Sequence, residues 1–164
     1  MSATDTPVLR YGARVLLLDP GDRVLLIHAM DPDNPDHRWW ELPGGGLATN
    51  TEAPRDAARR ELAEETGIVV GEIGDHLWDR ESRFVYRGRR HHRRDSVYLA
   101  RVTDTAPALT PEHTANEKAG LLGWHWWTNA ELTGTRDKLL PGNLARLHAD
   151  LIAGRLRQPL PLRL

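Results

Sequence analysis

The chain has 164 residues, a formal net charge of −1 at neutral pH and no cysteine. This length fits one domain with a buried core, and the absence of cysteine excludes disulfides, thiolate metal sites and a cysteine nucleophile. The small net charge excludes a global field that would attract a nucleic acid polymer or a membrane surface. We also expect no membrane span and no signal peptide, because the N-terminus is polar and apolar runs are short. The expectation is one cytoplasmic domain over residues 1–164, with flexible tails at 1–7 and 157–164.

The N-terminal part of the chain is typical of a β-hairpin followed by a loop. The apolar run within residues 8–18 predicts one or two strands with a buried segment. A turn is expected at 19–22, and the returning strand at 23–28. Residues 30–38 contain two prolines and several acids or amides. We therefore expect an exposed, mobile loop there.

A glycine loop then leads into a helix. The three glycines at 44–46 permit backbone conformations closed to other residues and let a ligand approach the main chain closely. Thr51 is the expected N-cap of a helix over roughly residues 52–66. Pro54 falls in the first turn of this helix, and Gly67 is its expected C-cap.

This helix gathers three carboxylates on one face. Glu61, Glu64 and Glu65 stand at i, i+3 and i+4, within about one turn of one another. Such a cluster is solvated by water or neutralised by cations, and carboxylate oxygens are ligands that Mg²⁺ prefers. The alternative is a solvated helix face whose charge is offset by Arg59 and Arg60.

The spacing of the charged and glycine residues decides between these two interpretations. The pattern consists of Gly46, Glu52, Arg60-Glu61-Leu62, Glu64-Glu65 and Gly67-Ile68. It resembles the Nudix box of MutT-like hydrolases, and the preceding Trp39-Trp40-Glu41-Leu42-Pro43 resembles the approach to that box. One departure is Thr51, where many relatives have glycine. The resemblance implies an α/β fold, the Nudix α/β/α sandwich, with a mixed sheet between helices.

The resemblance also implies an activity. Nudix hydrolases cleave a nucleoside diphosphate linked to another moiety, by attack of water on phosphorus, with Mg²⁺ or Mn²⁺ as cofactor. The substrate would be a small molecule, either a nucleoside triphosphate or a compound of the ADP-ribose and nucleotide-sugar type. The alternative is a non-catalytic Nudix-like module that binds or senses a nucleotide.

By resemblance, Glu64 and Glu65 are the main metal ligands and Glu61 is a ligand or the general base. The carbonyl of Gly45 is a further expected ligand. Arg60 is expected to orient the carboxylates through an ion pair, with Glu52 as the candidate partner.

The family often supplies one more glutamate before the last strand of the sheet. Glu117 is the better candidate for this metal ligand or base, and Glu112 is the second.

Substrate-binding residues are expected on both sides of the box. Trp39 and Trp40 are candidates for a base-stacking platform, with packing in the core as the alternative. Residues 88–95 are dense in arginine and histidine and are interpreted as a hairpin tip, either a solvated turn or a phosphate clamp. Arg83 and Arg87, on the strand before this tip, are equally credible clamps.

The rest of the chain is expected to supply the remaining strands of the sheet and a second helix that packs on it. Strands are expected at 68–78, 83–87, 96–102 and around 124–127, with a loop at 103–119. Residues 139–156 predict a core-facing helix from an apolar stripe at helical spacing. The leucines of the extended tail at 155–164 offer a surface for a second copy of the chain, which would make a homodimer.

Overall fold

The computed structural model describes residues 6–107, 111, 113, 120–156 and 160–163. Among these residues one sheet of nine strands is accompanied by helices. In chain order, the elements are β1 (Leu9–Leu18), β2 (Val24–Asp31), β3 (Asn34–Glu41), β4 (Gly44–Gly46), α1 (Pro54–Thr66), β5 (His76–Tyr86), β6 (Arg89–Arg101), β7 (Leu121–Trp127), α3 (Asn129–Gly134), β8 (Leu139–Leu140), α4 (Leu144–Ile152) and β9 (Leu160–Arg163).

The sheet is mixed and is built around β1. Its strand order is β8-β3-β2-β1-β6-β5-β9, with β4 paired to β1 and β7 paired to β2. The β1–β6 pair is parallel, as are β3–β8 and β5–β9, and the other pairs are antiparallel. Because β1 has partners on both sides, its apolar run is buried in the middle of the sheet.

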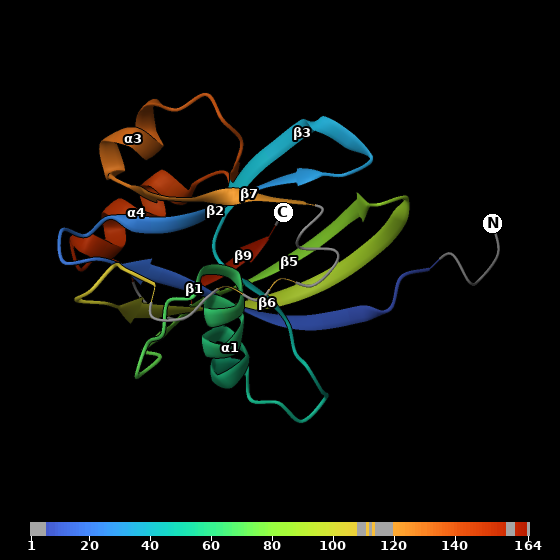
Figure 1. Cartoon of the computed structure of the whole chain (residues 1–164), viewed down its shortest axis with the longest axis horizontal. Helices are drawn as coiled ribbons and strands as arrows, with labels where there is room; N and C mark the ends of the chain where they lie inside the picture. The colour runs from blue at the N-terminus through green and yellow to red at the C-terminus, as the bar shows by residue number, and fades with distance from the viewer. Residues whose placement is uncertain (1–5, 108–110, 112, 114–119, 157–159, 164) are drawn as a thin grey trace.

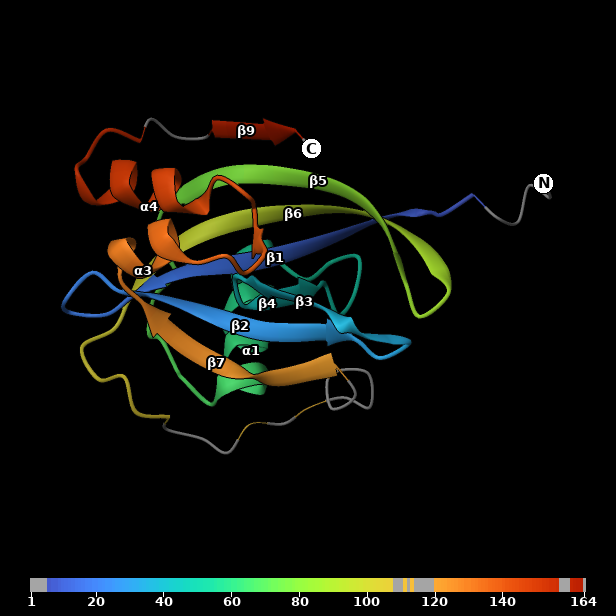
Figure 2. The same ribbon diagram turned by 90° about the horizontal axis from the view of Figure 1, so that it is seen from above.

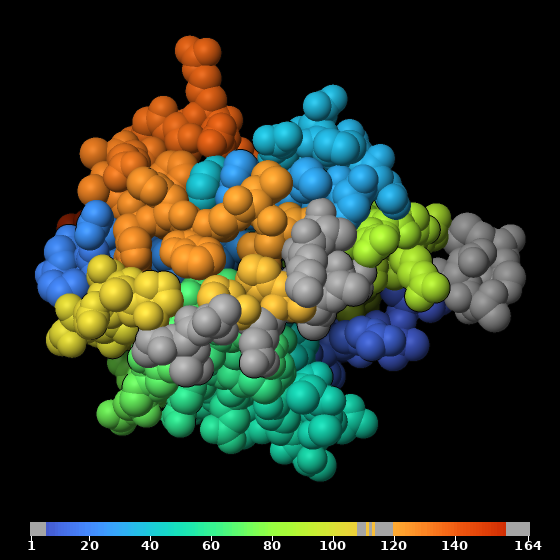
Figure 3. Space-filling view, in the orientation of Figure 1, coloured from blue at the N-terminus to red at the C-terminus, as the bar shows by residue number. Residues whose placement is uncertain are grey.

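Successive side chains of β1 point to opposite faces of the sheet and pack into two separate hydrophobic clusters. Val15 and Leu17 belong to the cluster that α1 covers, and Leu16 and Leu18 belong to the cluster that α3 and α4 cover. Figures 1 and 2 show these helices on the two sides of the sheet, and in Figure 3 the orange surface of β7 and α3 lies above the green surface of α1. The predicted α/β/α sandwich with a mixed sheet is confirmed.

The ends of α1 follow from its sequence at both termini. Pro54 occupies the first turn, and Gly67 adopts the left-handed conformation at φ 77° while its N–H donates to the Ala63 carbonyl. The expected N-cap was wrong: the cap position is Ala53, without a side-chain bond, and Thr51 lies before it. The helix therefore begins at Pro54 and not at residue 52.

Two polar segments expected outside the sheet are strands. The prediction of a loop at 30–38 is wrong, because β3 occupies Asn34–Glu41 and pairs with β2. The hairpin tip expected at 88–95 is also wrong, because β6 begins at Arg89 and the turn lies at Arg87 and Gly88, which have φ values of 52° and 73°. The basic side chains therefore stand on a strand with partners on both sides.

Other boundaries moved at the edges of the sheet. The strand expected at 68–78 begins only at His76. The helix expected at 139–156 is shorter, because Leu139–Leu140 forms β8 and α4 spans Leu144–Ile152. Residues Leu160–Arg163 of the extended C-terminal segment form β9 along β5. None of the helices in the described ranges is long and apolar enough to cross a membrane.

A buried histidine ties α4 to the rest of the fold. His148 donates from Nε2 to the Asp22 carbonyl at 2.7 Å, and its Nδ1 accepts from the Asn129 side-chain amide at 3.1 Å. These partners require the neutral imidazole. Burial lowers the pKa of His148, against the opposing effect of the Asp22 carbonyl.

Candidate active site

A cavity of about 400 Å³ lies between α1, β4 and residues of β1, β2, β3, β5, β6 and β7. Its lining residues are Arg14, Ile27, Ala29, Met30, Trp39, Glu41, Gly44, Gly45, Gly46, Glu61, Glu65, Phe84, Tyr86, Arg93, Gly120 and Leu121. Two carboxylates of the predicted cluster, Glu61 and Glu65, and all three glycines therefore lie on one wall. We call this space the first cavity.

Glu65 is the buried member of the carboxylate cluster. Its side chain accepts a hydrogen bond of 2.7 Å from the Gly44 backbone N–H, and the residue is 6% exposed. Burial raises the pKa of Glu65 well above the usual range, although the Arg14 charge and the Gly44 N–H oppose the shift. The backbone of β4, the strand formed by the three glycines, thus holds the Glu65 carboxylate in place.

Glu61 lies directly against the glycine strand. A Cβ built on Gly45 would lie 2.6–2.8 Å from the carboxylate atoms of Glu61, so only glycine leaves room for this packing. The Gly45 carbonyl oxygen lies near Gly12, where it would be 2.7 Å from a Cβ on that residue. Gly45 and Glu61 thus bring a backbone and a side chain of the box into contact.

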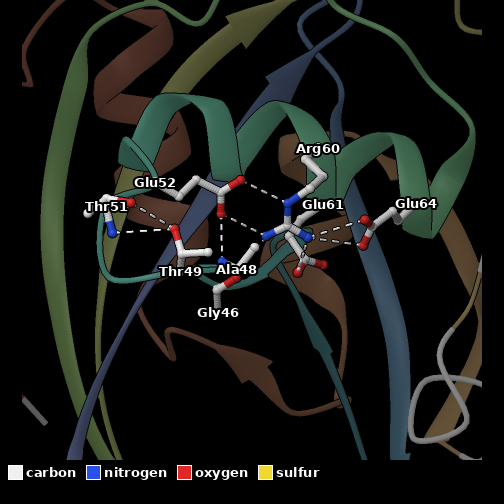
Figure 4. A network of polar contacts seen from close by, with 8 residues as sticks. All are labelled: Gly46, Ala48, Thr49, Thr51, Glu52, Arg60, Glu61 and Glu64. Atoms are coloured by element: carbon white, nitrogen blue, oxygen red, sulfur yellow. Dashed lines mark hydrogen bonds and ion pairs between the residues drawn. The ribbon is translucent and has the colours of Figure 1, made fainter.

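Arg60 connects the start of the box to its carboxylates (Figure 4). Its guanidinium donates to both oxygens of Glu52 at 3.0 Å, to the Gly46 carbonyl at 3.0 Å, and to Glu61 and Glu64 at 3.2 Å. Hydrogen bonds from Arg60 and from the Ala48 N–H lower the pKa of Glu52. The predicted Arg60–Glu52 ion pair is present, and the same arginine also reaches the carboxylates.

A second ionic network forms the floor of the cavity. Arg14 donates from Nε to Asp95 Oδ2 at 3.0 Å and from Nη1 to the Leu42 carbonyl at 2.7 Å. Arg93 donates to the other Asp95 oxygen at 3.1 Å, and Glu41 lies 3.6 Å from Arg14. Burial opposes the charged form of Arg14, but the nearby carboxylates prevail and raise its pKa. This network fixes the segment that leads into Gly44.

The structure separates the other predicted site residues. Trp39 lines the first cavity, whereas Trp40 stacks on His28 at 4.1 Å and donates from its indole to Asp137 at 3.0 Å. Glu64 is half-buried against Arg60 and lies outside the lining of the first cavity.

The two arginines proposed as clamps also differ in place. Arg83 lines a neighbouring cavity, and Arg87 lies in the turn between β5 and β6.

The donor set is the kind that a hard divalent cation requires, although it is incomplete in the part of the chain described. Glu61, Glu65 and Gly45 all line the first cavity, and oxygen ligands such as carboxylates and backbone carbonyls fit Mg²⁺. Across residues 6–107, 111, 113, 120–156 and 160–163, no group of three or more acidic, histidine or cysteine side chains is placed to hold a metal. Glu117 and Glu112 lie outside the described residues.

Several residues that line the cavity were not predicted from the sequence. Arg14 and Arg93 line the first cavity and bind Asp95, which lines the neighbouring cavity, and Tyr86 and Phe84 form part of the wall of the first cavity. A charged residue inside the apolar run of β1 was a usable signal for Arg14, because an arginine in a buried strand requires a partner. Nothing local indicated which carboxylate supplies it.

Comparisons with known proteins show the family of the chain. The sequence model of the NUDIX domain matches residues 8–151, so the chain belongs to the NUDIX domain family. A stretch of 32 residues is 69% identical to the RNA pyrophosphohydrolase of Bartonella henselae. That match covers 20% of this chain and 17% of the relative, so the chain spans only a small part of the relative's length.

Solved structures share the whole fold at low identity. The NUDIX domain of Shewanella oneidensis NrtR, complexed with ADP ribose, is 18% identical, with 93% of this chain and 94% of that chain covered and a TM-score of 0.63. The MutT protein of Methanosarcina mazei Go1 is 18% identical, with 92% and 98% covered and a TM-score of 0.59. The Ap4A hydrolase of C. elegans is 21% identical, with 88% and 98% covered and a TM-score of 0.57.

Proposed function

We propose that this chain is a pyrophosphohydrolase that cleaves a nucleoside diphosphate linked to another moiety, with Mg²⁺ or Mn²⁺ as cofactor. The observation that carries the proposal is the meeting of Glu61 and Glu65 with the glycines of β4 on one wall of a 400 Å³ cavity. Arg14 and Arg93 line the same cavity and place guanidinium groups beside the space for an anionic substrate. A nucleoside triphosphate and an ADP-ribose or nucleotide-sugar compound both belong to this substrate class.

Different residues of the chain would hold the metal and orient its ligands. When bound, the metal neutralises the diphosphate and promotes attack of water on phosphorus, with cleavage of the bridging P–O bond. Glu61, Glu65 and the Gly45 carbonyl would hold the metal, with Glu64 joining them from the adjacent turn. Arg60 keeps these carboxylates oriented through its bonds to Glu61 and Glu64.

Substrate contacts follow from the lining of the cavity. Trp39, Phe84 and Tyr86 offer aromatic surface to a nucleobase, and Trp39 is the member of the predicted tryptophan pair that faces the cavity. We assign Arg83 a role at the rim of the neighbouring cavity. Arg87, in the adjoining turn, remains a candidate for contact with a larger substrate.

The first experiment is a substrate panel with a matched pair of variants. Nucleoside triphosphates, ADP-ribose, NADH, dinucleoside polyphosphates and a 5′-triphosphorylated RNA oligonucleotide are incubated with Mg²⁺ or with EDTA, and products are identified by ³¹P NMR. Metal-dependent release of a phosphate-bearing product is expected from at least one compound. In Glu65→Gln the rate should fall by about 100-fold or more, because the amide still accepts from Gly44 but carries no charge.

Glu72→Gln is the control for this variant, since Glu72 is exposed in the connection between α1 and β5. Its rate should match that of the wild type. Full activity in Glu65→Gln would refute the site. Nucleotide binding measured by calorimetry without turnover of any compound would instead favour the alternative, a nucleotide-binding module.

A further inference from the structure

A second cavity of about 280 Å³ continues from the first. Six residues line both spaces: Arg14, Trp39, Glu41, Phe84, Tyr86 and Arg93. The second cavity is also lined by Asp31, His37, Arg80, Ser82, Arg83, Val85, Asp95, Lys138 and Leu140. A ligand that enters the first cavity can therefore extend past the aromatic side chains into the second.

Positive charge exceeds negative charge in the lining of the second cavity. Five cationic side chains line it with three carboxylates, those of Asp31, Glu41 and Asp95. Arg83 and Lys138 are exposed, so the partly buried cations are the three guanidinium groups of Arg14, Arg80 and Arg93. Both oxygens of Asp95 are already occupied, by Arg14 at 3.0 Å and by Arg93 at 3.1 Å. Glu41 is 3.6 Å from Arg14. One cation of the three therefore lacks a carboxylate of its own.

Arg80 is that cation. It stands directly opposite Asp95 in the β5–β6 ladder, but no ion pair joins Arg80 to any carboxylate of the described residues. Burial lowers the pKa of Arg80, and the Arg14 charge adds to this effect, ahead of the opposing carboxylates. A half-buried guanidinium without a counter-ion is costly in a folded chain, so an anion from outside would complete the site.

Hydrogen-bond donors are in excess at the same place. The Nε atoms of Arg80 and Arg93 and the indole Nε1 of Trp39 are buried and have no hydrogen-bond partner. All three atoms are donors and belong to residues that line the second cavity. Ser82 also lines the second cavity, as do the exposed residues Arg83 and Lys138. These three donors lack acceptors, and a phosphate group would supply them.

We propose that the second cavity binds a phosphate group of the substrate that is separate from the diphosphate that is cleaved, with Arg80 as the residue that selects for it. This inference rests on the proposed function, and it narrows the substrate to a nucleotide derivative that carries an additional phosphate. The diphosphate lies at the Glu61 and Glu65 wall, the base lies along the aromatic side chains, and the additional phosphate meets Arg80.

Calorimetric titration tests this preference without any catalytic step. The wild-type chain is titrated with adenosine 5′-monophosphate, adenosine 2′,5′-bisphosphate and adenosine 3′,5′-bisphosphate, in the presence of EDTA. One of the bisphosphates should bind at least about tenfold more tightly than the monophosphate, the factor expected for one charge-assisted hydrogen-bonded pair. The better bisphosphate shows whether the additional group is a 2′- or a 3′-phosphate. Equal dissociation constants for all three compounds would overturn the proposal.

Variants of single arginines then show which residue causes the preference for a bisphosphate. Arg80→Gln should abolish the difference between bisphosphate and monophosphate, and Arg80→Lys should restore part of it. Arg94→Gln is the control, because Arg94 is an exposed arginine on β6 that pairs with Asp79 at 3.4 Å, and it should keep the full difference. A preserved difference in Arg80→Gln would overturn the assignment.

Thermal unfolding separates recognition from a structural role. Because Arg80 has no carboxylate partner in the described residues, Arg80→Gln should melt no lower than Arg94→Gln. A clearly lower melting temperature would mean that Arg80 supports the fold, against the proposal. Loss of the proposed function would appear differently: no compound of the substrate panel would be hydrolysed, whereas the binding preference for a bisphosphate would remain.

Discussion

Replacement of Arg14 by glutamine removes the centre of the ionic network under the first cavity. The side chains of Arg14 and Asp95 are 13% and 6% exposed, and their Nε–Oδ2 distance is 3.0 Å. The variant leaves Asp95 with Arg93 alone and leaves the Leu42 carbonyl without its 2.7 Å donor. A buried carboxylate that has lost its main counter-ion is the principal cost.

The magnitude of this cost is set by burial. Removal of one partner from a buried ion pair costs about 3–5 kcal/mol, whereas an exposed pair contributes about 1 kcal/mol or less. For a chain of this length each kcal/mol lowers the melting temperature by about 2–4 °C. We therefore expect Arg14→Gln to melt about 10 °C below the wild type at pH 7.

Urea and thermal unfolding, followed by circular dichroism, measure the change. Arg101→Gln is the matched control, because its pair with Asp22 has the same kind of geometry at 3.1 Å but side chains that are 58% and 43% exposed. It should lose about 1 kcal/mol at most. If Arg14→Gln loses no more than this control at pH 7, the reasoning from burial is wrong.

The pH dependence gives a second test of the same pair. Burial tends to raise the pKa of Asp95, but Arg14 and Arg93 prevail and hold it below its usual range. A depressed folded-state pKa contributes stability above the unfolded value, which is lost as pH falls. The stability difference between the wild type and Arg14→Gln should therefore narrow as the pH falls from 7 to below about 4. A constant difference would contradict the role of Asp95.

Two further predictions concern Gly45 and His148. In Gly45→Ala the new Cβ would lie 2.6–2.8 Å from the Glu61 carboxylate, so hydrolysis should fall at least about tenfold while Gly71→Ala, with nothing within 4 Å, stays at the wild-type rate. Activity assays on both alanine variants decide the point, and equal rates would contradict it. The folded-state pKa of His148 is lowered, so stability is complete above about pH 6.5 and falls as the unfolded chain takes up a proton below it. The slope of unfolding free energy between pH 7 and 5 should decrease in His148→Asn; an unchanged slope would exclude His148 as its source.

The box helix could be predicted because its signals are local. Pro54, Gly67 and the alanine-rich turns between them specify a helix with defined ends, and Glu61 and Glu65 follow at fixed spacing. The same reasoning failed for β3 and for the first half of β6. Both strands carry polar side chains toward solvent and toward the cavity, so the alternation of apolar and polar residues that marks a half-buried strand is absent.

The floor of the site could not be predicted because its contacts are remote in sequence. Arg14 and Asp95 are 81 residues apart, and their contact depends on the register between β1 and β6. The sequence contains several other carboxylates that are equally suitable as partners. The two tryptophans before the box differ for a similar reason: adjacent residues on a strand point to opposite faces, and only the strand pairing decides which face is the cavity.

The parallel pairing of β1 with β6 has a consequence for assembly during synthesis. A nascent chain can form the β1–β2 hairpin, the glycine strand and helix α1 before β6 has left the ribosome. Until then, β1 lacks its longest pairing, and Arg14 has no Asp95 to meet. Closure of this long loop is slow relative to local structure. Helix α1 is thus made early, whereas the floor of the cavity that it faces is the part completed late.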